Sequence, residues 1–177
     1  MPRRIDSNGQ PEPLDPEVIE KFLKVGIPYR LAMLRLAEDV SPAQSTIDSA
    51  FIEAAIVSGR LLMQFLGLGI ERRGGLKLVQ RHDYHMADGH TDEVKIPDLG
   101  GRFVDITSLH RATKETLAQF HNGASKASAH LTWDSGHQLS LENLLRGISV
   151  IRTLVSTHLP QRETEGKKGE KAGSPQF

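Results

Sequence analysis

Hydrophobic residues recur every three or four positions along most of the chain, which is the spacing of one face of an α-helix. The first such pattern begins at Asp15-Pro16-Glu17, where a capping carboxylate precedes a proline at the first helical position. It continues to Leu36 but is interrupted by Gly26 and Pro28. The pattern therefore predicts either one helix with a break or two short helices.

The second pattern predicts a helix at the centre of the fold. It opens at Ser41-Pro42, ends at Gly67 or Gly69, and is apolar on nearly every side. Because charged residues interrupt it, no uncharged run approaches the ~18 residues of a membrane span. Small residues give a neighbouring helix room to approach closely: Ala54, Ala55, Ser58 and Gly59. We expect four side chains to be buried, namely Phe51, Ala55, Leu62 and Phe65, and two to have polar partners, Glu53 and Arg60.

Two further helices follow a long segment of different character. Glycine and proline punctuate residues 70–103, and the short apolar pieces 76–79 and 94–96 are candidates to pair as a small hairpin. The third helix begins at Thr107 or Ser108, and the fourth begins at Ser140 and ends near His158. The sequence predicts an all-α protein, an antiparallel four-helix bundle with a long loop or small hairpin between the second and third long helices.

Composition sets the limits of this domain. Residues 1–14 are polar and proline-rich and predict a flexible arm, residues 15–159 form the helical domain, and residues 160–177 form a disordered polar tail.

Twenty-two basic and 22 acidic residues give a net charge of zero, which argues against broad coating of nucleic acid or of a membrane. The absence of cysteine excludes disulfides, thiolate metal sites and a cysteine nucleophile. The start lacks the apolar run of a secretory signal, and we expect a cytoplasmic protein.

Candidate chemistry lies on the third helix. Asn122, Lys126 and His130 recur every fourth residue and therefore share one ridge. Lys126 could hold a phosphate while His130 titrates near neutral pH, and Arg60 of the second helix could supply a further cation. The alternative is structural: a histidine in the last turn of a helix is favoured by the helix dipole, and Arg60 can be satisfied by an ion pair in the core.

These two helices resemble those of HEPN-type (higher eukaryotes and prokaryotes nucleotide-binding) proteins. The resemblance rests on the long helix from Ala50 to Gly67 and on the segment Lys126-Ala127-Ser128-Ala129-His130-Leu131-Thr132. HEPN ribonucleases are metal-independent and place an Arg, a polar residue and a His in a dimer cleft. His130 matches that His, but Ser125 and Lys126 stand where the Arg would be. The resemblance implies a homodimer with a site that faces RNA or a nucleotide, and no cofactor.

Three hypotheses about function follow. The first is a binding or interaction module with a degenerate site for RNA or a nucleotide. The second is a metal-independent ribonuclease of the toxin or defence type, in which His130 is the general acid or base and Lys126 or Arg60 stabilises the transition state. The third is a metal-dependent hydrolase on the loop histidines His82, His85 and His90, although their spacing matches no metal motif and a solvated loop is the simpler interpretation.

Overall fold

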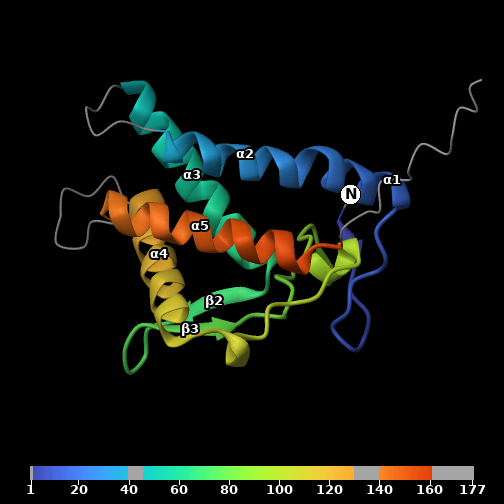
Figure 1. Cartoon of the computed structure of the whole chain (residues 1–177). Helices are drawn as coiled ribbons and strands as arrows, with labels where there is room; N and C mark the ends of the chain where they lie inside the picture. The colour runs from blue at the N-terminus through green and yellow to red at the C-terminus, as the bar shows by residue number, and fades with distance from the viewer. Residues whose placement is uncertain (1, 40–45, 130–139, 161–177) are drawn as a thin grey trace, which may run out of the picture.

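The computed structural model describes residues 2–39, 46–129 and 140–160 of the chain. Most of these residues are helical, and four helices are long (Figure 1). In chain order the long helices are α2 (Ile27–Glu38), α3 (Thr46–Phe65), α4 (Arg111–Ala129) and α5 (Leu141–His158). No helix in the described ranges is both long enough and apolar enough to cross a membrane.

The first helical pattern forms one run with an irregular middle. Helix α1 (Pro16–Lys21) leads through the π-helical segment η1 (Phe22–Gly26) directly into α2. The Asp15 side chain accepts a hydrogen bond from the backbone N–H of Glu17, which confirms the predicted start. Pro28 has no N–H to give to an α-helical bond, and the wider π turn lies immediately before it. The predicted break is therefore a π segment and not an end of the helix.

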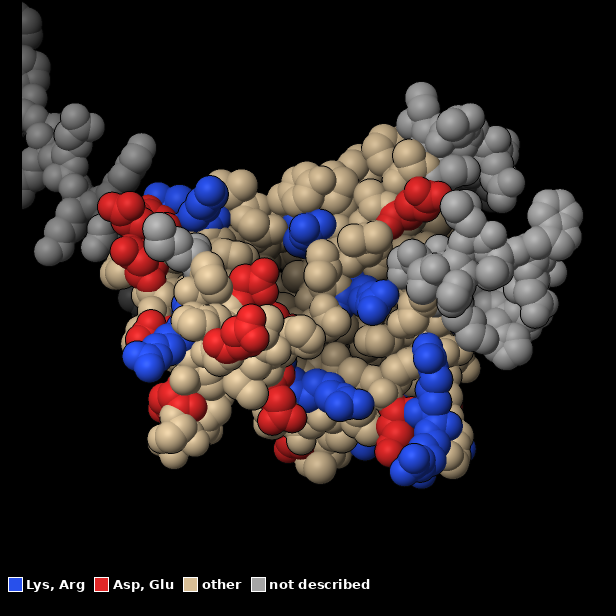
Figure 2. Space-filling view, turned by 180° about the vertical axis from the view of Figure 1, so that it is seen from behind, with Lys and Arg blue, Asp and Glu red and all other residues tan. Residues whose placement is uncertain are grey.

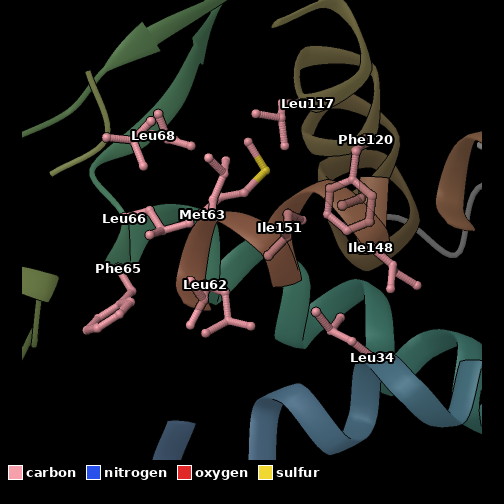
Figure 3. Close-up of a cluster of buried hydrophobic side chains, with 14 of the residues drawn as sticks. Leu34, Leu62, Met63, Phe65, Leu66, Leu68, Leu117, Phe120, Ile148 and Ile151 are labelled. Atoms are coloured by element: carbon pink, nitrogen blue, oxygen red, sulfur yellow. The ribbon is translucent and has the colours of Figure 1, made fainter. Parts of the chain in front are cut away.

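Helix α3 lies at the centre of the core. Leu62 and Met63 of this helix, and Leu66 directly after it, are almost completely shielded from solvent and meet side chains of the other helices and of the hairpin (Figure 3). Ala55 and Phe65 are buried too, as predicted, whereas Phe51 is only half-buried. The predicted opening of this helix at Ser41-Pro42 lies outside the described residues.

Phe120 of α4 shows how closely the helices approach each other. Its ring lies between Gly59 of α3 and Gly147 of α5, and a Cβ atom added to either glycine would lie about 2.5 Å or less from a ring atom (2.4 Å and 2.5 Å). The ring itself is fully buried. The small residues of α3 thus serve the close packing predicted from the sequence.

The predicted antiparallel four-helix bundle is wrong. Figure 1 shows α4 running steeply across the direction of α2 and α5 instead of alongside them. The segment between α3 and α4 also forms a layer of its own beneath the helices, where its strands belong to two small antiparallel sheets, one of them completed by an N-terminal strand. Its apolar side chains complete the core, so it is more than a loop: Leu68, Leu78, Ile96, Leu99 and Val104 are buried.

Only one of the two predicted pieces takes part in the hairpin, since 76–79 contributes one strand and its partner comes from residues before it. Strand β2 (Leu68–Glu71) pairs with β3 (Lys77–Gln80), with Ile70 opposite Leu78, whereas residues 94–96 are not a strand. Two glycines with positive φ, Gly74 and Gly75, form the turn, since only glycine adopts this backbone shape readily. The sequence Leu-Gly-Ile-Glu looks like the end of a helix, which is why the first strand was missed.

The second sheet ties the N-terminal residues to the layer beneath the helices. Strand β1 (Arg3–Arg4) pairs with β4 (His90–Thr91). The guanidinium group of Arg3 donates a hydrogen bond from each Nη atom to the Asp98 carboxylate, with N–O distances of 2.9 Å and 3.0 Å. Both side chains are about nine-tenths shielded from solvent. Asp98 belongs to the short 3-10 helix η2 (Ile96–Leu99). At these residues the N-terminal segment is therefore in contact with the domain.

A second 3-10 turn, η3 (Ile106–Ser108), precedes α4. The Asp105 carboxylate caps it by accepting from the N–H of Thr107. Helix α4 consequently begins at Arg111, a few residues after the predicted start. The predicted cap of the last helix is confirmed, because the Ser140 hydroxyl accepts from the N–H of Asn143.

Candidate functional site

Polar and basic side chains from three elements meet beside the middle of α4. This helix packs against α3 on one side and against the β2–β3 hairpin on another. His121, Asn122 and Ser125 come from α4, Arg60 comes from α3, and Arg72 comes from the turn between β2 and β3. We call these five residues the arginine–histidine cluster.

Two hydrogen bonds organise the cluster. The Arg72 guanidinium donates from Nε to Oδ1 of Asn122 over 3.2 Å, which links the hairpin turn to α4. One helical turn along, the Ser125 hydroxyl lies 3.3 Å from Nδ1 of His121. Which of those two atoms donates depends on the tautomer of the imidazole. Because only Nε of Arg72 is used in this bond, its Nη atoms can donate to a further acceptor.

The surroundings of His121 keep its imidazole neutral. Burial lowers the pKa of this group, and the positive charges of Arg60 and Arg72 lower it further, to about 4. Both effects disfavour the protonated imidazolium, because it would lose hydration and would face two other cations. At neutral pH the cluster therefore holds two guanidinium charges and one neutral ring with a single N–H.

This set of groups suits an anion with several oxygen atoms. Guanidinium forks match phosphate oxygens in geometry and charge, and a neutral imidazole and a hydroxyl can each add one hydrogen bond. The groups come from a helix pair and a tight turn, so their backbones are fixed before any ligand binds. The cluster has the chemistry of a phosphate-binding site.

The structure brings together only part of the predicted site. Arg60 and Asn122 belong to the cluster, and Arg60 contributes to the field at His121. Lys126 lies one helical turn after Asn122 in α4, and the structure does not describe its side chain. His130 lies outside the described residues. Their proposed roles therefore stay predictions.

Sequence reasoning missed His121, and it placed Arg72 only in a basic patch with Arg73, Lys77 and Arg81, for which RNA phosphates and solvated surface were the two interpretations. The spacing of His121 and Ser125, four residues apart on the helix, was an available signal for His121. Arg72 belongs to a run of basic residues that is typical of exposed surface. Only the pairing of β2 with β3 brings it to α4, so no local pattern could have indicated its contact with Asn122.

The three loop histidines do not converge in the structure. Within the described ranges, no three histidine or carboxylate side chains converge in a way that could hold a metal ion. The His82 ring instead stacks on Phe103, with centroids 4.2 Å apart. Nδ1 of His90 lies 2.9 Å from the carbonyl oxygen of Asp88. The structure thus separates side chains that are neighbours in the sequence.

Surface charge around the cluster is mixed. Figure 2 shows basic and acidic side chains distributed over one face of the molecule, with no continuous positive band. Arg72 and Arg73 in the hairpin turn and Lys77 at the start of β3 are exposed, but the neighbouring Glu71 is exposed as well. A long nucleic-acid duplex would need a broader positive surface than this.

Comparison with protein-family models, with curated proteins and with solved structures finds no match to this chain. Any assignment of function to the cluster rests on its own chemistry.

Proposed function

We propose that the protein is a binding module that holds a phosphate group of RNA or of a nucleotide in the arginine–histidine cluster. One observation carries the proposal: guanidinium groups from two separate elements act on one half-buried imidazole, and Asn122 orients one of them. Guanidinium groups, an amide and an imidazole together offer several hydrogen-bond donors to the oxygen atoms of one phosphate.

The mixed surface charge indicates the size of the ligand. A cluster with two guanidinium groups can engage one or two phosphates, and the nearby Arg73 and Lys77 can reach a neighbouring phosphate of a flexible strand. Net charge is zero, so long-range attraction adds little. We therefore propose a mononucleotide or a short single strand as the ligand, bound with modest affinity.

The proposal is tested by fluorescence anisotropy of a labelled single-stranded RNA, with unlabelled AMP and ATP as competitors. Arg72→Ala removes a phosphate contact and should weaken RNA binding by about tenfold, since a hydrogen bond to a charged group contributes roughly 1.5–3 kcal/mol. The slope of log affinity against log salt should fall by about 0.7, the value for one phosphate contact on a single strand.

Arg146→Ala is the matched control. Arg146 is exposed on α5 and is paired with Glu142 of the same helix at 2.7 Å. Its loss should leave both the affinity and the salt slope unchanged. If RNA and both nucleotides fail to bind, or if Arg72→Ala binds as wild type does, the proposed function is wrong. Competition by AMP as strong as competition by the oligonucleotide would identify a nucleotide site.

Ribonuclease activity through His130 remains a prediction and is measured on the same RNA. If His130 is a general acid or base, His130→Ala should lower cleavage by about 10²–10⁴ while binding persists, and a chelator should have no effect. The resemblance to HEPN proteins, a homodimer and a location in the cytoplasm also remain predictions. Sedimentation of the full chain measures the oligomeric state directly.

A further inference from the structure

A pocket of about 320 Å³ opens between the start of α2, the end of α3 and the loop that follows β4. This volume lies at the lower end of the roughly 300–1,000 Å³ of small-molecule sites. Apolar side chains form most of its walls: Phe22, Ile27, Leu61, Leu62, Phe65 and Val94. It differs from the arginine–histidine cluster, which shares no residue with it.

The walls of this pocket are held in place before any ligand enters. The π-helical segment η1 contributes Phe22 and Gly26, and π turns within helices are frequent at functional sites. Opposite, the buried Lys95 donates from Nζ to the carbonyl oxygens of Arg81 and Asp83, at 3.1 Å and 2.7 Å. The pocket thus has one helical wall and one wall fixed by a hydrogen-bonded lysine.

Of the four charged residues at the pocket, two neutralise each other. The Glu93 carboxylate lies 3.7 Å from Nζ of Lys95 and also accepts from the backbone N–H of His85. Asp92 is exposed at the rim, where water screens its charge. Arg30 is half-buried, and its guanidinium carbon lies 5.4 Å from the ring centre of Tyr29. In the part of the chain that the structure describes, Arg30 forms no ion pair.

We infer that this pocket binds a small apolar carboxylate, with the hydrocarbon part among Phe22, Leu62 and Phe65 and the carboxylate on Arg30. The unneutralised charge inside the walls is positive, so an anionic group is favoured over an ammonium group. The guanidinium fork also matches a planar carboxylate in a two-point contact. The size of the pocket favours one aromatic ring or a short branched chain over a long acyl chain.

The test uses three probes with the same phenylalkyl body and different charge: 3-phenylpropionate, phenethylamine and 3-phenylpropanol. Calorimetry on the full chain should show that the carboxylate binds at least about tenfold more tightly than the amine or the alcohol, because only it gains a hydrogen bond between charged groups. Comparable binding of all three probes would show that the pocket is a purely apolar site and would overturn the inference.

Variants locate the site. Arg30→Met keeps the apolar stem of the side chain and should weaken binding of 3-phenylpropionate by about tenfold or more. Arg35→Met is the matched control on the same helix, since Arg35 is exposed and does not line this pocket, and it should bind as wild type does. Equal affinity of the two variants would contradict the assignment of Arg30.

Two further variants keep the inference testable if Arg30→Met folds poorly. Asp92→Asn removes a negative charge from the rim and should leave binding of the carboxylate equal or tighter, whereas an amine ligand would bind more weakly to it. Leu61→Glu places a carboxylate at the mouth from a side chain that is 40% exposed, and it should abolish binding without unfolding the chain. Retained affinity in Leu61→Glu would overturn the proposed location. RNA binding through Arg72 should be unaffected by either variant.

Discussion

The imidazole of His121 lies half-buried on α4, with two guanidinium groups close enough to contribute to lowering its pKa to about 4. An unfolded histidine titrates near 6.5, so between these two pH values the unfolded chain binds more protons than the folded chain does. The contribution of His121 to stability is therefore fully present above pH 6.5, falls as the pH is lowered through this window, and is lost below about 4.

His121→Gln removes this titration and should make the melting temperature less sensitive to acid between pH 6.5 and pH 4. Thermal unfolding at a series of pH values, followed by circular dichroism, measures the effect. His85→Gln is the matched control, because His85 is exposed and only its backbone N–H has a hydrogen bond here. A wild-type acid dependence in His121→Gln would show that this imidazole is not held neutral by the fold.

At the scale of elements, the packing of α3, α4 and α5 depends on the absence of two side chains. Alanine normally stabilises a helix relative to glycine by about 1 kcal/mol. At Gly59 and Gly147 the new methyl group would lie 2.4 Å and 2.5 Å from the Phe120 ring, so the ring or a helix must move. Gly59→Ala and Gly147→Ala should each lower the free energy of unfolding by about 1–3 kcal/mol, as overpacking usually does.

Urea denaturation measures both variants. Ser149→Ala is a control on α5, since Ser149 is exposed and the added helix propensity should leave stability equal or slightly higher. If both glycine variants unfold at the same urea concentration as wild type or at a higher one, then Phe120 does not lie between the two helices as described.

At the scale of the whole molecule, Arg3 connects the N-terminal strand to the layer beneath the helices. Its guanidinium group pairs with Asp98, donates to the carbonyl oxygens of Glu12 and Glu93, and lies 5.6 Å from the ring centre of Tyr84. Burial raises the pKa of the Tyr84 hydroxyl, and the nearby Asp98 carboxylate raises it further. One N-terminal side chain thus satisfies polar groups from three separate segments.

Arg3→Met leaves the Asp98 carboxylate shielded from solvent and without its main partner. The free energy of unfolding should therefore fall by about 3–5 kcal/mol. Hydrogen exchange should rise in residues 81–99 before it rises in α3, since this layer loses its anchor first. Arg4→Met is the control, because Arg4 is the exposed neighbour in the same strand. Wild-type exchange in residues 81–99 of Arg3→Met would show that the N-terminal strand does not hold this layer.

The parts of the structure that were predictable from sequence depend on local signals. Asp15 and Ser140 cap their helices as expected, and the apolar face of α3 is buried, because caps and periodicity act over a few residues. The steep crossing of α4, the pairing of β2 with β3 and the contact of Arg3 with Asp98 join residues far apart in the chain. No local pattern encodes such contacts, and the bundle prediction was wrong for this reason.

In the candidate site, too, the residues with a local signal were predictable and the long-range contacts were not. Arg60 was singled out as a charged residue on an otherwise apolar helix, and Asn122 because it recurs with Lys126 and His130 every fourth residue. Arg72 is separated from Asn122 by 50 residues, and their hydrogen bond exists only through the hairpin turn. The low pKa of His121 also requires burial and two distant cations, neither of which is visible in the sequence.

The titration of His121 in the presence of a phosphate ligand tests the central claim most directly. NMR of the imidazole Cε1–H should give a pKa of about 4 in the free protein. With saturating AMP or a short RNA, the phosphate charge offsets that of Arg60 and Arg72, so the pKa should rise toward its ordinary value. A pKa that stays at about 4 with the ligand bound would contradict a phosphate site at this cluster, as would a free protein that titrates near 6.5.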